Sequence, residues 1–201
     1  SDPSYSINEA WTDGSLLHDG RTRTYFQYVP TDGNPQGLML VLHGSGDTVA
    51  HLISEIAVEA TAEENGILVV VPAGIDGGWN DEEPPGGDLA DDVGFIDALV
   101  ANVKNEYPSL LDDQVFAHGF SNGGGLATRL ACESSQIRGV GVIGNYYYPF
   151  PDGCLRPTGH PVPGWFGMGL EDEIVPVESV RDTMSSYADD LTDCSTSGSL
   201  E

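Results

Sequence analysis

The sequence predicts an α/β fold: one open, largely parallel β-sheet with helices on its faces. Short β-branched and aliphatic runs alternate along the chain with segments whose apolar residues recur at helical spacing. This alternation is typical of parallel strands joined by helices. The length of 201 residues is that of one domain, so we expect a single domain over residues 1–201.

Six segments have the composition of strands. The run Arg23–Val29 ends at Pro30, and the continuous apolar runs Gly37–Leu42 and Ile67–Val71 are typical of strands buried on both faces. Further strands are expected at Gln114–His118, Gly139–Ile143 and Pro163–Met168.

Four segments have helical periodicity. Val49–Asn65 has an apolar face and stops at Gly66, and Asp91–Tyr107 begins with two aspartates and ends before Pro108. The other two helices are expected between the turn at residues 119–123 and Glu133, and over Val177–Leu191.

The charge of the chain is strongly one-sided. Thirty-two Asp and Glu against seven Lys and Arg give a net charge of −25, which argues against nucleic-acid and anionic-membrane partners. No apolar run reaches the ~20 residues that span a bilayer, and no signal segment opens the chain. A surface this negative repels itself unless salt screens it, so we hypothesise a high-salt source. The alternative is an ordinary acidic secreted protein.

The cysteines and the first residue bear on location and cofactors. Cys132, Cys154 and Cys194 allow at most one internal disulfide, and no zinc or EF-hand spacing occurs, so we expect no metal and no cofactor. Ser1 in place of Met fits either a processed secreted chain or a cleaved tag, and we favour secretion.

The clearest chemical motif is Gly-x-Ser-x-Gly at residues 119–123, centred on Ser121. It lies between an expected strand and an expected helix, which is the setting of a nucleophile elbow. A side chain at either flanking position would collide with neighbouring backbone, hence the two glycines. The alternative is a purely structural turn. The motif in its context predicts that Ser121 is a nucleophile.

Small residues follow the buried strand that ends at Leu42. In His43-Gly44-Ser45-Gly46 the backbone can fold over the site and aim an N–H at a reacting carbonyl. The backbone N–H groups of Ser45 and Asn122 are therefore the expected oxyanion donors. An ordinary β-turn is the alternative. A phosphate cradle is disfavoured because the P-loop pattern is absent.

An acidic loop at residues 169–176 follows the last expected strand. A carboxylate there lies at the carboxyl end of the sheet, on the same side as Ser121, where Asp172 would orient a histidine and stabilise its cation. The neighbours Glu171 and Glu173 are expected to be solvated.

These residues together resemble the α/β-hydrolases of the polyhydroxybutyrate-depolymerase and feruloyl-esterase type. The resemblance runs from about His18 to Cys194 and includes residues 18–23, 42–44, 78–80, 91–96, 119–124 and 171–176. It implies an α/β-hydrolase fold and a carboxylesterase that forms an acyl-enzyme on Ser121, with Asp172 as the triad acid.

The triad histidine is the main departure from this resemblance. In that family it follows the acid on a later loop, yet no histidine occurs from Glu173 to Glu201. We therefore expect the chain to be incomplete at its C-terminal end, lacking the strand and helix that would deliver the base. A rewired triad through His43 or His118 is the alternative.

Three residues are expected to contact the substrate at the rim: His43, Trp79 in the loop from Ala73 to Leu89, and Tyr146 at the start of an aromatic run. The acidic rim suits neutral esters, small or polymeric, such as feruloyl or acetyl esters of carbohydrates or a hydroxyalkanoate polyester. Besides an esterase, the sequence leaves open a non-catalytic binding module of the same fold and a serine peptidase or thioesterase.

Overall fold

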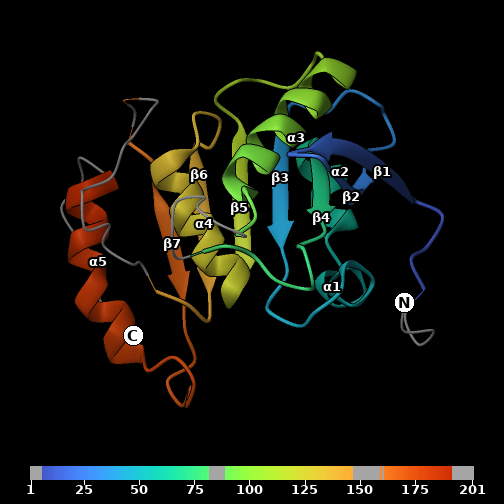
Figure 1. Cartoon of the computed structure of the whole chain (residues 1–201). Coiled ribbons are helices and arrows are strands. Elements are labelled where there is room, and N and C mark those ends of the chain that lie inside the picture. Colours follow the sequence, from blue (N-terminus) through green and yellow to red (C-terminus); the bar gives the residue numbers. More distant parts are fainter. Residues whose placement is uncertain (1–5, 82–88, 147–158, 160, 192–201) are drawn as a thin grey trace.

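The computed structural model describes residues 6–81, 89–146, 159 and 161–191. Within these residues seven strands form one sheet in the order β1-β2-β4-β3-β5-β6-β7 (Figure 1). Their bounds are β1 (Trp11–His18), β2 (Arg21–Tyr28), β3 (Gly37–Leu42), β4 (Ile67–Pro72), β5 (Val115–Phe120), β6 (Gly139–Ile143) and β7 (Gly164–Gly167). The pairs β1–β2 and β2–β4 are antiparallel and all other neighbours are parallel. The predicted α/β fold with a largely parallel sheet is confirmed.

Helices cover both faces of the sheet. The described residues contain five, namely α1 (Val49–Ile56), α2 (Glu59–Asn65), α3 (Asp92–Glu106), α4 (Asn122–Glu133) and α5 (Val177–Leu191). α3 and α4 share the larger apolar cluster with the sheet, whereas α1 and α2 pack on the other face around Ile53 and Ala62 (Figure 1). α5 packs beside β7, where the Tyr187 ring meets Phe166 edge-on at 5.0 Å.

The central strands are apolar along their whole length because both of their faces are covered. Leu38, Leu40 and Leu42 of β3 are fully buried, and Leu68–Val71 of β4 are at most 1% exposed. Continuous aliphatic runs therefore produce the buried middle of a parallel sheet, as the sequence predicts.

One predicted helix is divided in two. Ala57 adopts a left-handed φ of 39°, which ends α1, and α2 begins at Glu59. Glu59 accepts the Trp11 indole N–H and Glu63 accepts the Tyr28 hydroxyl. These bonds to β1 and β2 set the direction of α2 separately from α1.

The first strand, β1, was not among the predicted elements. It is an edge strand that pairs with β2 alone, and most of its side chains are exposed or half-buried. Its sequence has no clear apolar alternation, because Trp11 is its one fully buried apolar residue and Leu16 is only partly buried against the core. β1 is therefore a strand because it pairs with β2, and the spacing of its apolar residues does not predict it.

The parallel strands end along one edge of the sheet. Phe120 of β5 pairs with Ile143 of β6, and Ile143 pairs with Gly167 of β7, so the last residues of the three strands form one row. β2 runs the opposite way and therefore begins at this edge, with Arg21. The loops that leave this carboxyl edge carry the candidate site.

Candidate active site

Ser121 occupies a strained turn between β5 and α4. Its φ of 50° and ψ of −123° lie in a region that side chains rarely adopt, at a typical cost of about 1–3 kcal/mol. Its N–H donates to the Ile143 carbonyl at 2.8 Å, and its carbonyl accepts from the Asn145 amide at 2.8 Å. No hydrogen bond of the Ser121 hydroxyl is formed with the described residues. The backbone of this serine is held from β6 while its hydroxyl is left available.

The glycines that flank Ser121 are required by close backbone contacts. A Cβ on Gly119 would collide with the Gly123 carbonyl, and a Cβ on Gly123 would collide with the carbonyl oxygens of Leu42 and His43. The first turn of α4 therefore packs directly on the backbone at the end of β3. The expected reason for both glycines is confirmed.

The two predicted oxyanion donors lie beside one cavity. Ser45 and Asn122 both line a space of about 400 Å³ at the carboxyl edge, together with Arg21, Asp76 and Trp79. In the described part of the chain, neither backbone N–H makes a hydrogen bond. Asn122 is the first residue of α4, where the helix carries partial positive charge. The cavity is thus lined by the two residues whose backbone N–H groups are the expected donors to a developing negative charge.

Trp79 lies deeper than a residue of an exposed rim. It is 6% exposed, its indole N–H donates to the His43 carbonyl at 2.9 Å, and its ring packs on the His43 ring at 4.9 Å. Its backbone N–H and carbonyl both bond to the Asn122 side chain, at 2.7 and 3.0 Å. Trp79 therefore touches the cavity and also joins α4 to the end of β3.

His43 has both ring nitrogens engaged. Nε2 accepts the Gly74 N–H at 3.0 Å, so the proton lies on Nδ1, which donates to the Gly44 carbonyl at 2.8 Å. The residue is 2% exposed. These contacts favour a role in holding the loop after β3 over contact with substrate.

Tyr146, the third predicted substrate contact, lies just beyond β6. It is half-buried, and its N–H donates to the Asn145 side chain at 2.8 Å. The rest of the aromatic run, residues 147–150, lies outside the described residues.

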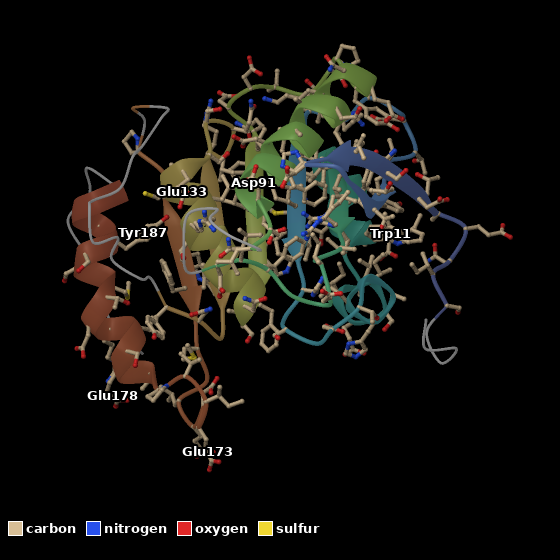
Figure 2. All side chains as sticks on the ribbon, viewed as in Figure 1. Trp11, Asp91, Glu133, Glu173, Glu178 and Tyr187 are labelled. Carbon is tan, nitrogen blue, oxygen red and sulfur yellow. The ribbon has the colours of Figure 1, made fainter. Side chains whose placement is uncertain are left out.

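Asp172 lies on the loop after β7, at the same edge as Ser121. Oδ1 accepts the backbone N–H groups of Ile174 and Val175, each at 2.9 Å. These two donors hold the pKa of the Asp172 carboxyl below its usual value. Figure 2 shows the neighbouring Glu173 on this loop, beyond the end of β7. Among the described residues no hydrogen bond joins Ser121 to Asp172, so a catalytic triad of the predicted kind would need a histidine to bridge them.

None of the described histidines provides that bridge. His18 bonds to Asp91 at 3.0 Å and His51 to Asp47 at 2.7 Å. His118 lies within β5, lines a different cavity, and has its pKa lowered by burial. Neither His118 nor His43 hydrogen-bonds to Ser121 or Asp172, and His160 lies outside the described residues.

Two buried arginines secure the backbone at Asn80, directly after Trp79, and were not singled out from the sequence. Arg23 donates to Asp92 at 2.7 Å, and Asp92 accepts the Asn80 N–H at 2.7 Å. Arg129 donates to the Asn80 carbonyl at 2.9 Å. In a chain with seven basic residues, an arginine among the apolar residues of α4 is a signal that could have found this anchor.

The described residues include no candidate metal site and no candidate membrane span. They contain no group of three or more His, Cys, Asp or Glu side chains that could hold a metal ion. Among them, no helix is long and apolar enough to cross a membrane.

The fold is similar to that of known structures. A thermostable esterase superposes with a TM-score of 0.72 at 16% identity, over 92% of this chain and 53% of that one. The chain has the α/β-hydrolase fold. No family model matches the sequence.

Curated relatives confirm the resemblance found from the motifs. "Putative esterase NocK" of Nocardia uniformis subsp. tsuyamanensis is 31% identical over 80% of this chain and 48% of its own length. Feruloyl esterase C of Emericella nidulans is 29% identical over 78% of this chain and 57% of its own. The chain spans about half the length of the curated relatives it matches.

Proposed function

We propose that this protein is a serine carboxylesterase that hydrolyses neutral esters through an acyl-enzyme on Ser121. One observation carries the proposal: Ser121 is strained and its hydroxyl makes no hydrogen bond with the described residues, while its neighbour Asn122 and Ser45 line one cavity and have backbone N–H groups that are unpaired among those residues. The names of the curated relatives support the same activity.

The reaction assigns a role to each residue. Ser121 Oγ attacks the ester carbonyl carbon while its proton passes to a base, and the carbonyl oxygen becomes negative. The N–H groups of Ser45 and Asn122 stabilise that oxygen. The alcohol then leaves with the proton, and water releases the acid by the same route. Asp172 Oδ1 is taken by its own loop, so Oδ2 is the atom that orients the base.

None of the described histidines is placed to act as the general base of this reaction. A serine hydrolase without its histidine keeps only the acceleration from the oxyanion donors and from binding, typically ~10³–10⁴ over water. We therefore propose that residues 1–201 hydrolyse activated esters slowly and that added imidazole accelerates them.

The test compares p-nitrophenyl acetate hydrolysis by the wild type and by Ser121→Ala, with and without imidazole. The proposal expects hydrolysis that depends on Ser121 and that imidazole increases beyond its own background. Equal rates for the two proteins in both conditions would overturn it. Hydrolysis that depends on Ser121 but ignores imidazole would mean that a histidine of the chain is the base.

The substrate class follows from the cavity and the relatives. A cavity of about 400 Å³ suits the acyl or alcohol part of a small ester or one end of a polymer. We propose feruloyl or acetyl esters of carbohydrates, or hydroxyalkanoate oligomers. Rates on methyl ferulate, acetylated xylan and hydroxybutyrate trimers would separate these classes.

We also propose that the protein is secreted. Cys132 is disulfide-bonded, and disulfides persist in oxidising compartments outside the cytosol. Thiol titration of protein isolated from its native source, without reductant, should find one free thiol among the three cysteines, and three would contradict secretion.

A binding protein of the same fold is the second candidate, because both ring nitrogens of His43 are engaged and His118 lines a different cavity. It predicts that Ser121→Ala binds the ester as tightly as the wild type and that the wild type does not turn it over.

A further inference from the structure

The two proposed oxyanion donors come from different elements, yet a single loop contacts both. Ser45 follows β3 and Asn122 begins α4. The loop at residues 74–80 touches the first region through a bond from the Gly46 N–H to the Gly77 carbonyl at 2.7 Å. It touches the second through Trp79, whose backbone is held by Asn122.

Asn122 contributes more than its backbone N–H. Its side-chain oxygen accepts the Trp79 N–H at 2.7 Å and its amide donates to the Trp79 carbonyl at 3.0 Å. Both polar atoms of the Asn122 side-chain amide are thus bonded to the backbone of Trp79. Because the side chain is held, rotation of the Asn122 backbone, and with it the direction of its N–H, is restricted.

Trp79 also restrains the loop after β3. Its indole N–H donates to the His43 carbonyl at 2.9 Å, and this same carbonyl lies against Gly123 of α4. The peptide that begins at the His43 carbonyl leads to Gly44 and then to Ser45. The next peptide carries the Ser45 N–H, and its Gly44 carbonyl accepts the His43 Nδ1–H at 2.8 Å. The bonds of Trp79 and of the His43 ring together therefore restrain the backbone that aims the Ser45 N–H.

We propose that Trp79 and the side chain of Asn122 are positioning residues that hold the Ser45 and Asn122 N–H groups at a common point. This inference rests on the proposed function, since it concerns the oxyanion of that reaction. An oxyanion site loses much of its effect when a donor is displaced by about 1 Å. The hydrogen bonds of Trp79 and of the Asn122 side chain keep the two N–H groups, which belong to separate elements, within about this distance of their working positions.

The test uses Trp79→Phe, which keeps the ring on His43 but removes the indole N–H. Its matched control is Trp11→Phe, because Trp11 is 5% exposed and donates one indole bond, to Glu59 at 2.9 Å. Trp11 lies in β1, on the opposite side of the molecule from the loop with Glu173 (Figure 2). Asn122→Ala is the second variant, and it removes both bonds to the Trp79 backbone.

The readout is the affinity of an alkyl boronic acid, which forms a tetrahedral adduct with a serine and places a negative oxygen in the oxyanion site. We expect Trp79→Phe to bind it about tenfold more weakly than the wild type, since one positioning hydrogen bond is lost. We expect the affinity for the boronic acid to fall more than tenfold in Asn122→Ala and less than twofold in Trp11→Phe. Thermal unfolding of each variant checks that it is folded.

The outcomes separate this inference from the proposed function. If wild type and Ser121→Ala bind the boronic acid equally, the proposed function fails and the inference fails with it. If binding depends on Ser121 but folded Trp79→Phe binds as tightly as Trp11→Phe, only the inference is overturned. If Trp79→Phe does not fold, Asn122→Ala decides by the same comparison.

Discussion

At the scale of single residues, Asp172 shows how a loop can prepare a carboxylate. Two consecutive backbone N–H groups bond to Oδ1, so Oδ2 is the atom that orients a base in the mechanism that we propose. The carboxylate therefore stabilises the loop on which it lies.

The first prediction concerns the titration of Asp172. Its folded pKa lies below the ordinary value of 3.8, so its contribution to stability is present above that value and is lost as the pH falls through the lowered one. Carbon-13 NMR of the side-chain carboxyl should give a midpoint below 3.8, with the resonance assigned by its absence in Asp172→Asn. A midpoint at or above 3.8 would mean that the two backbone bonds are not formed in solution.

The place of a site residue in the fold was predictable where a sequence motif determines the local backbone conformation. The turn at Ser121 and the loop of Asp172 follow parallel strands whose carboxyl ends form one edge, so the sheet topology puts both at that edge. The burial of Trp79 and His43 was not predictable. It depends on hydrogen bonds between loops that are distant in sequence, which composition does not record.

At the scale of elements, the elbow depends on how closely α4 approaches β3. The second prediction is that Gly123→Ala destabilises the fold by about 1–3 kcal/mol or more, because its Cβ would meet the carbonyls of Leu42 and His43. Gly37→Ala is the matched control, since its Cβ would meet only ordinary contacts from 3.5 Å outward. Urea unfolding measures both, and equal stabilities would contradict the described contact between α4 and β3.

The third prediction concerns the ion pair that joins β2 to α3. Arg23 is 4% exposed, Asp92 is 1% exposed, and Asp92 also holds the Asn80 N–H. Arg23→Leu leaves a buried carboxylate unpaired and should cost about 3–5 kcal/mol. Lys104→Met, which breaks the more exposed pair with Asp112, should cost less than about 1 kcal/mol. Chemical denaturation measures both, and similar losses would refute the assignment of Arg23 as an anchor.

Most elements were predictable because their apolar periodicity is set by burial. β3, β6 and α5 have the predicted bounds, and α4 ends at the predicted Glu133. The break between α1 and α2 was not predictable, since it reflects bonds from Glu59 and Glu63 to side chains of β1 and β2.

At the scale of the whole molecule, the net charge of −25 sets the conditions for stability. The fourth prediction is that the free energy of unfolding rises between about 10 mM and 1 M salt, as the Debye length falls from ~30 Å to ~3 Å. Denaturation curves at several KCl concentrations measure it. A flat response, or a decrease, would reject the proposed high-salt adaptation.

The central claim is that Ser121 is a nucleophile whose adduct faces the N–H groups of Ser45 and Asn122. The most direct measurement is a crystal structure of the protein treated with an alkyl fluorophosphonate. The account predicts phosphorus bonded to Ser121 Oγ and the phosphoryl oxygen about 2.7–3.1 Å from both nitrogens. An adduct on another residue, or a phosphoryl oxygen turned away from both N–H groups, would contradict it.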